Sequence, residues 1–391
     1  MTAVRRFFGE GFRVFFLSAG LYALLAVGLW TVSLVMPVPL PSRVPSVEWH
    51  AHELIFGFGA AALGGFLLTA VPNWTGARAA RHVFIVVAAG LWLAGRLAVG
   101  FSDMLSPVLV AVTDLAFLPV LAAKIATQFI RRPKPQNVMF LGLLALIWTA
   151  NLFVHLDWTG LATGTARVGL YAGLYGLVAM IAVLGGRVTP AFTRNAMRRS
   201  GRETGLPRSF PRLDAAAIAA AIALVLATLA GAPDRIVGIV ALLAGAGQIA
   251  RLAFWRGGYT LGQPILWSLH LSFALIGIGL VLAGLAAFGI GDPVGALHVV
   301  AIGGVGGMTL AVMSRASLGH SGRPLVAPAP LAIAYGLLPV AALLRWVAAT
   351  VPDVFRAATL AAGAAWMLAF LLYVTALWPA LWGPRLAQSP E

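Results

Sequence analysis

Long apolar runs alternate with short polar stretches along almost the whole chain. Twelve such runs lie near residues 14–36, 52–71, 83–101, 106–129, 137–156, 166–185, 213–231, 235–255, 265–289, 294–314, 327–349 and 355–382. About 20 helical residues cross the roughly 30 Å hydrocarbon core of a bilayer, whereas barrel strands are shorter and alternate apolar with polar residues. The pattern therefore predicts an all-α polytopic membrane protein with twelve transmembrane helices, forming a single transmembrane domain over residues 1–391.

Basic residues are distributed unevenly between the loops that join these runs. The loops after even-numbered runs are rich in arginine and lysine, for example Arg131, Arg132 and Lys134, while the other loops are acidic or mixed. Because basic loops stay on the cytoplasmic side, both termini are expected to be cytoplasmic. The longest basic loop, residues 186–212, is expected to lie over lipid headgroups, with ligand binding as the alternative.

The composition narrows the class further. Of the 391 residues 60% are hydrophobic and 10% are charged, whereas soluble domains carry about 25% charged residues. The net charge of +15 would also suit nucleic-acid binding. The arginines flank apolar runs as the positive-inside rule requires, so no nucleic-acid partner is expected. The absence of cysteine excludes disulfides, thiolate metal ligands and thiol catalysis.

One span carries side chains that lipid does not select. In residues 49–76, WHAHELIFGFGAAALGGFLLTAVPNWTG, His50, His52 and Glu53 crowd the outer end. Glu53 shares a helical stripe with small residues, so it is expected to face protein. Ionisable groups at membrane depth are costly and usually functional. This helix is therefore the predicted site. The small residues are Gly57, Ala61, Gly64 and Gly65.

Histidines also gather on one side of the predicted membrane. His50, His52, His155 and His298 all fall at outer ends of spans, whereas His270 lies inside a span near its cytoplasmic end. Neutral imidazole is the commonest metal ligand, so the group favours metal ligation over isolated interfacial histidines. His50 and His52 point to different sides of one helix and could serve two centres, or one centre if His50 precedes the helix. Four residues before His155, Asn151 fits a supporting partner.

Two further features concern charge and repetition. Arg96 and Asp114 lie at similar depths in neighbouring spans and are predicted to form a structural ion pair, with a proton relay as the alternative. The inner ends of spans 2, 6 and 10 resemble one another over residues 67–78, 184–195 and 310–323. This similarity predicts three pseudo-symmetric four-helix arcs, unless it is a coincidence in a chain rich in glycine and alanine.

Three segments in the same order are similar to the signature segments of the NnrS family: residues 49–76, GGRVTPAFTRN (185–195) and MTLAVMSRASLGHSGRPL (308–325). The resemblance runs over essentially the whole chain. It implies a bacterial inner-membrane protein that carries haem, expected to be of the b type, and copper, and that acts in the response to nitric oxide. The family's motif residues carry over onto His50, His52, Glu53, Asn73, Trp74, Arg187, His298, Arg315, His320 and Arg323.

The architecture is also distantly similar to that of haem–copper oxidases, which ligate haem through histidines at the outer ends of helices 2 and 10. His52 and His298 occupy those places here. Spans 6 and 7 contain no histidine, so the copper trio of the oxidases has no counterpart. Copper ligands would then be found among His50, His155, Glu53 and His270.

Two classes of function remain open. The first is a haem and copper protein that binds or turns over nitric oxide and protects against nitrosative stress; whether it is an enzyme, and its redox partner, stay undecided. The second is a polytopic transporter of small solutes without a redox cofactor. Arg187 and Arg315 end spans in equivalent repeats, where a guanidinium could hold a carboxylate. They would either bind the propionates of an inner haem ligated by His270 or form a structural clamp.

Overall fold

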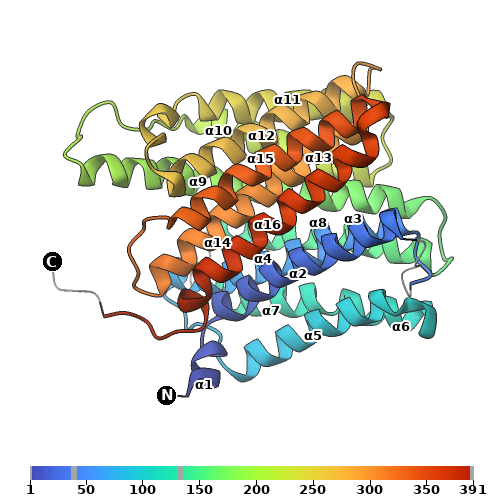
Figure 1. Ribbon diagram of the computed structural model, residues 1–391, viewed down its shortest axis with the longest axis horizontal. Helices are drawn as coiled ribbons and strands as arrows, with labels where there is room; N and C mark the ends of the chain where they lie inside the picture. Colours follow the sequence, from blue (N-terminus) through green and yellow to red (C-terminus); the bar gives the residue numbers. More distant parts are fainter. Residues whose placement is uncertain (1, 37–41, 130–134, 388–391) are drawn as a thin grey trace. The chain divides into compact units, whose positions relative to one another are not determined.

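Residues 2–36, 42–129 and 135–387 are described by the computed structural model of the protein, in which they form helices and no strands (Figure 1). Among these residues, twelve helical stretches are long and apolar enough to cross a membrane, which confirms the predicted all-α polytopic fold. Arg131, Arg132 and Lys134 lie outside the described residues. The helices are α1 (Ala3–Phe7), α2 (Gly11–Val35), α3 (Ser46–His52), η1 (Glu53–Gly59), α4 (Ala60–Thr75), α5 (Val83–Gly100), η2 (Ser102–Met104), α6 (Pro107–Leu115), α7 (Phe117–Phe129), α8 (Pro135–Trp158), α9 (Thr165–Arg199), α10 (Pro211–Leu229), α11 (Asp234–Leu252), η3 (Gly257–Thr260), α12 (Pro264–Ala286), α13 (Pro293–His298), η4 (Val299–Gly306), α14 (Gly307–His320), α15 (Ala329–Thr350), η5 (Pro352–Val354) and α16 (Phe355–Leu381).

The sixth span continues well past its predicted end. The sequence predicts a loop from residue 186, but α9 runs on to Arg199 and only about the second half of the basic stretch leaves the helix. The added turns are amphipathic: their buried positions recur at helical spacing, while the arginines occupy the remaining positions. A change from an apolar to an amphipathic helix was therefore mistaken for a helix end. The buried positions are Gly186, Thr189, Pro190, Thr193, Ala196 and Met197.

Two spans contain a π-helix directly after a histidine. In the second span, η1 begins one residue after His52, and in the tenth span η4 begins one residue after His298. π-helical turns are rare and often mark functional sites. Nothing in the apolar pattern predicts them. They make spans 2 and 10 alike at the histidines that the sequence pairs, although the three arcs stay a prediction.

The chain divides into two compact units. Unit 1 comprises residues 1–173, 313–324 and 374–391, and unit 2 comprises residues 174–312 and 325–373. In unit 1, α2 packs on α4 and η1, α5 on α6, and α7 on α8. In unit 2, α11 lies between α10 and α12, and α12 also packs on η4. The single domain over residues 1–391 stays a prediction.

Arg13 joins two distant segments of unit 1. Its side chain is 1% exposed, and its guanidinium donates hydrogen bonds to the backbone carbonyls of Ala380 and Leu381 at 3.1 Å and of Gly383 at 2.8 Å. The Nε atom lies 2.6 Å from Glu10 Oε2. Helix C-termini leave carbonyls without intrahelical partners and carry partial negative charge. Arg13 therefore caps α16 from the start of α2.

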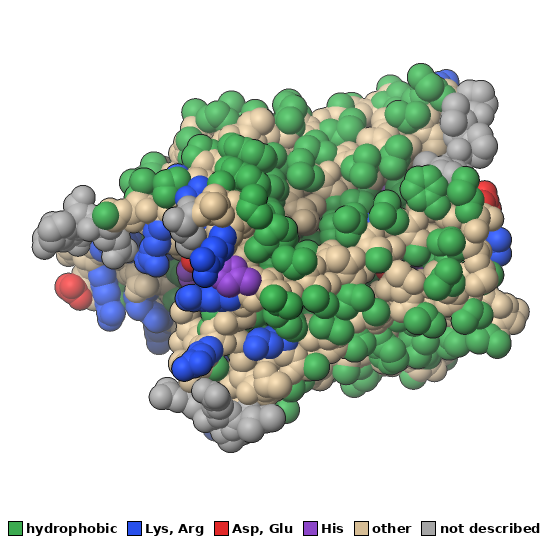
Figure 2. All heavy atoms as spheres, turned by 90° about the horizontal axis from the view of Figure 1, so that it is seen from below, with side chains coloured by type: hydrophobic (Ala, Val, Ile, Leu, Met, Phe, Trp, Pro, Cys, Tyr) green, Lys and Arg blue, Asp and Glu red, His purple; other side chains and the backbone are tan. Residues whose placement is uncertain are grey.

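The surface suits a lipid environment. Many large apolar side chains are exposed, including Leu25, Val86, Val112 and Leu243. Hydrophobic side chains are spread over the face shown in Figure 2, and the Lys and Arg side chains visible there gather mainly at the left of the view. A monomeric protein in water rarely exposes so much apolar surface. The exposure agrees with a multi-pass membrane protein.

Candidate metal centre

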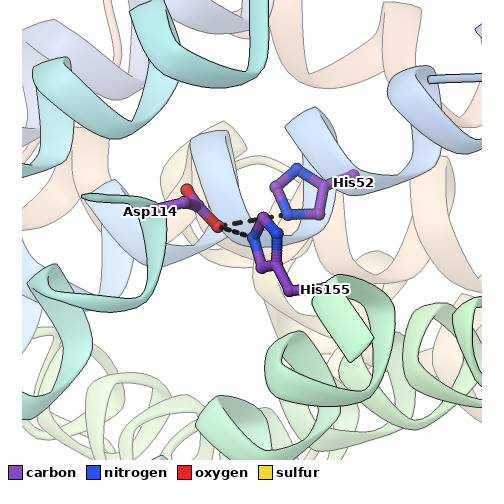
Figure 3. A group of neighbouring side chains, drawn as sticks. All are labelled: His52, Asp114 and His155. Atoms are coloured by element: carbon purple, nitrogen blue, oxygen red, sulfur yellow. Dashed lines mark hydrogen bonds and ion pairs between the residues drawn. The ribbon is translucent and has the colours of Figure 1, made fainter. Parts of the chain in front are cut away.

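The first unit holds a buried group of metal-ligating side chains. His52 ends α3, Asp114 lies on α6, and His155 lies near the end of α8. One ligand atom from each lies within 4.8 Å of the others, and all three residues are buried. Figure 3 shows the imidazoles of His52 and His155 directed at the carboxylate of Asp114. The Nε2–Oδ2 distances are 3.3 Å for His52 and 2.8 Å for His155.

A guanidinium holds two buried carboxylates beside this group. Arg96 on α5 donates one hydrogen bond to Glu53 Oε1 at 2.7 Å and a second to Asp114 Oδ1. The other oxygen of Glu53 accepts a hydrogen bond from the Tyr22 hydroxyl. These contacts confirm the predicted Arg96–Asp114 ion pair and the prediction that Glu53 faces protein. Buried charges require such pairing because desolvation is expensive.

A glycine makes room for the guanidinium. A Cβ atom added at Gly57, within η1, would lie 2.9 Å from Arg96 Nη1 and 2.6 Å from Tyr22 Cε1. Trp92 donates its indole N–H to the Gly57 carbonyl at 2.9 Å. The small stripe of the second span thus admits Arg96 and Tyr22 at close range, in place of a lipid chain or another helix backbone.

The hydrogen-bond network needs one more positive charge than neutral imidazoles supply. His52 Nδ1 lies 2.8 Å from Glu53 Oε1, and its Nε2 lies 2.9 Å from Asn151 Oδ1, so both ring nitrogens face acceptors. A neutral imidazole carries only one N–H. Turning the Asn151 amide over would satisfy His52, but it would set the amide oxygen against Asp114 Oδ2, 2.8 Å away. One additional proton or one metal cation removes the conflict in either arrangement.

The donor set and its surroundings fit a first-row metal ion. Two imidazoles and a carboxylate suit zinc, copper or iron. Glu53 accepts from the far nitrogen of His52, and a metal-ligating histidine usually has such a partner. Asn151 lies one helical turn before His155, but the hydrogen bonds of its amide are to His52 and Asp114. With both carboxylates ionised and both imidazoles neutral, Arg96 leaves the cluster at a net charge of −1. A proton or a monovalent ion such as Cu(I) would balance that charge.

The other predicted ligands lie apart from this group or support it. Glu53 uses both oxygens in hydrogen bonds within the network. The His50 ring stacks on Trp30 at a centroid distance of 4.7 Å, and His50 is outside the group of three ligands. In unit 2, the His298 Nδ1 atom lies 2.7 Å from the Val294 carbonyl. When the Nδ1 N–H donates to this carbonyl, the lone pair of the ring lies on Nε2, as in many metal-bound histidines.

His270 is nine-tenths buried on α12. Its Nε2 atom lies 2.9 Å from Thr193 Oγ1, and no hydrogen-bond partner for its Nδ1 atom is found among the described residues. Arg187 is exposed on α9, and Arg315 is buried on α14. The two belong to different units, and their roles as a structural clamp or as partners of haem propionates stay predictions.

The remaining motif residues make local contacts near helix ends. Asn73 donates to the Thr69 carbonyl at 3.0 Å. Trp74 stacks on Phe140 at a centroid distance of 5.3 Å. These contacts are consistent with a structural role at the end of span 2, and those of His320 and Arg323 with a structural role at the end of span 10.

His320 lies 5.7 Å from the Phe12 ring between centroids. Arg323 donates to the carbonyls of Ser321 and Pro384 at 3.5 Å. Partial burial and the positive charge of Arg13 lower the pKa of the Arg323 guanidinium.

Sequence reasoning missed Asp114 as a possible ligand and Tyr22 as a partner of Glu53. Asp114 is the only acidic residue of its span, and such a residue invites the question of what it binds. The ion pair with Arg96 accounts for only one carboxylate oxygen of Asp114, and the second oxygen faces His155. No pattern in the chain identifies Tyr22.

The fold and the buried His–Asp group define a polytopic membrane protein with a candidate metal centre. The NnrS family, described as NnrS protein, matches residues 6–385, which is nearly the whole chain. The chain belongs to this family, which supports a membrane protein associated with the nitric oxide response and, in general, with metal and haem binding. No curated protein matches the chain.

Proposed function

We propose that the protein holds a metal ion through His52, Asp114 and His155 and binds nitric oxide in the membrane, protecting the cell against nitrosative stress. The observation that carries the proposal is the set of three ligand atoms within 4.8 Å of one another inside a membrane-spanning fold. Nitric oxide is small and uncharged, so it reaches a buried centre through lipid.

The surrounding side chains would hold the ligands in place. Glu53 would keep the Nδ1 proton of His52, so that Nε2 carries the lone pair toward the ion. Asn151 would orient the Asp114 carboxylate, which it contacts at 2.8 Å. Arg96 would favour the ionised forms of Glu53 and Asp114 by offering each a charge-assisted hydrogen bond. Copper is the expected ion because of the family and because imidazole suits it.

A haem is the second proposed cofactor, with His298 as its ligand; the sequence also carries His52 over for this role, but we assign His52 to the metal centre. His298 suits this role because its Nδ1 faces a backbone carbonyl. His52 Nε2 already faces Asp114, so one atom cannot serve both cofactors at once. If bound, the haem would supply iron that can capture nitric oxide. Residues of this chain would supply the axial imidazole and the apolar surroundings.

Metal analysis of the purified protein tests the first part. Replacing His155 by Ala or Asp114 by Asn should remove most of the bound copper. The control variant Asp103→Asn changes an exposed acid in η2 and should keep the copper. A His50→Ala variant that loses copper while His155→Ala keeps it would refute the proposed ligand set in favour of one centred on His50.

An absorption spectrum tests the proposed haem and distinguishes a haem protein from a transporter. His298→Ala should abolish or shift the Soret band while the protein stays in the membrane. A wild-type protein with neither a Soret band nor bound metal would favour a transporter. Transporters often use discontinuous helices at the midplane, whereas Ser46–Thr75 and Pro293–His320 are continuous here.

An inner haem ligated by His270 remains the alternative to a structural role for Arg187 and Arg315. We favour the structural role. Haem quantitation decides between them: one haem per chain, unchanged in a His270→Ala variant, supports the structural role, and two haems, falling to one in that variant, support the inner haem.

A further inference from the structure

A polar cavity lies at one end of unit 2. It has a volume of about 880 Å³ and is lined by residues that follow α9, by the segment after α11 and by η3. Arg202 and Arg256 are its charged lining residues, and Thr204 and Tyr259 add hydroxyl groups. The metal centre proposed above is built from other residues in the other unit. The sequence places this end on the predicted cytoplasmic side.

The end of α9 fixes the position of Arg202. Gly201 has φ +77°, its N–H bonds the Arg198 carbonyl, and the Arg202 N–H bonds the Met197 carbonyl at 2.9 Å. These two bonds and the left-handed glycine form a Schellman motif, a defined helix ending. The Arg202 guanidinium lies over the Tyr259 ring, 5.3 Å from its centroid. An exposed arginine is thereby held at the cavity.

The tyrosine is itself held in place. Its hydroxyl lies 2.8 Å from Ser200 Oγ and donates to the Ala196 carbonyl at 3.3 Å. The segment 200–210 is tied down at its far side, where the Arg208 N–H bonds the Phe254 carbonyl at 3.0 Å. Both walls of the cavity are thus joined by hydrogen bonds and a cation–π contact.

Arg256 adopts a backbone conformation that disfavours a side chain. Its φ is +61°, in the left-handed region, although Gly257 and Gly258 follow immediately and would take that conformation without steric cost. Such a conformation is sterically costly for a non-glycine residue and is concentrated at functional sites. The chain places its second cavity arginine at this strained position.

Neither cavity arginine has an anionic partner among the described residues. The ion pairs found there involve other arginines, namely Arg13, Arg96 and Arg251. Residues 194–212 contain six arginines and a single acid, Glu203, which does not line the cavity. The cavity therefore carries two positive charges, two hydroxyl groups and no lining carboxylate.

We propose that this cavity binds a phosphate group, either of an anionic lipid headgroup or of a soluble phosphate compound. Guanidinium forks match phosphate oxygens in pairs, and two of them here lie with the Thr204 hydroxyl around one space. A lipid headgroup would arrive from the membrane surface beside α9, and a soluble phosphate compound would arrive from the aqueous side. The chemistry of recognition is the same for both.

The test uses the full-length protein in detergent. Native mass spectrometry with phosphatidylglycerol reports the lipid arm, and calorimetric titration with inorganic phosphate and with ADP reports the soluble arm. An Arg202→Gln/Arg256→Gln variant should bind at least about tenfold more weakly, since a hydrogen bond to a charged group is worth about 1.5–3 kcal/mol. Arg198→Gln/Arg199→Gln is the matched control. It removes two exposed charges from the same helix end outside the cavity.

The outcomes distinguish the two possible sources of the phosphate group and also test the proposal itself. Binding of phosphatidylglycerol alone identifies a lipid, and binding of phosphate or ADP identifies a soluble ligand. Arg202→Lys/Arg256→Lys keeps the charge but loses the fork, and it should fall between wild type and the glutamine variant. No binding in either arm, or an equal loss in the Arg198/Arg199 control, would overturn the proposal, because diffuse surface charge would then explain the effect.

Discussion

Replacing Arg96 by Met should destabilise the protein strongly. The guanidinium side chain is 4% exposed and donates one hydrogen bond to each of two carboxylates that are themselves at most 1% exposed. Removal of one partner from a buried ion pair costs about 3–5 kcal/mol, since the remaining charge is left without compensation. Solvent screening is small here because none of the three groups reaches water.

The loss is best read as a thermal shift in detergent, followed by size-exclusion chromatography of heated samples. An unfolding entropy of about 2.1 cal/mol/K per residue over 391 residues converts 3–5 kcal/mol into roughly 4–6 °C. Membrane helices that stay helical when heated release less entropy than a soluble chain does. The midpoint should therefore fall by about 4 °C or more.

Two further variants isolate the cause. Arg43→Met removes an exposed arginine of the same unit and should change stability by less than about 0.5 kcal/mol. The triple variant Glu53→Gln/Arg96→Met/Asp114→Asn removes the stranded charges and should recover at least half of the loss. If the single Arg96 variant melts within 1 °C of wild type, as the Arg43 control should, the argument for a charge-coupled network is wrong.

Other predictions follow from single contacts. Gly57→Ala should cost about 1–3 kcal/mol, since its new methyl group meets Tyr22 and Arg96, whereas Gly90→Ala, with open space around it, should leave the melting midpoint unchanged or raised. Glu53→Gln should weaken copper binding by about 10–100-fold without abolishing it, as expected of a supporting partner, and a complete loss in metal titrations would make Glu53 a ligand. Reporter fusions after Leu206 should give a cytoplasmic signal and fusions after Asp157 a periplasmic one; the reverse would place the histidines on the inner side.

The sequence predicts the spans well because each depends on local composition. Twenty apolar residues require a helix in lipid whatever their neighbours are. The burial of Glu53 was also predictable, because a carboxylate on a stripe of small residues is expected to face protein rather than lipid. The end of α9 was not, because its burial depends on contacts made within unit 2, including the hydrogen bond between Thr193 and His270.

The arrangement of the metal centre was only half predictable. His52 and His155 were singled out by type and depth, but their meeting depends on α3 and α8, which are about 100 residues apart. Asp114 reaches both only because Gly95 leaves room: a Cβ there would lie 2.9 Å from Asp114 Oδ1. Such a close approach between α5 and α6 leaves no periodic trace in the chain. Gly95 looks like any other glycine of an apolar span.

The contact between Arg13 and residues 380–383 bears on how a ribosome can deliver this protein. The whole metal centre of unit 1 lies within the first 173 residues. The carbonyls that Arg13 binds are synthesised 367 or more residues after it. Segments made first usually fold first, at about 5–20 residues per second. For roughly 20 seconds or more, the Arg13 guanidinium at the start of α2 therefore lacks the carbonyls that it later binds, and Glu10, water or lipid phosphate would pair with it during that time.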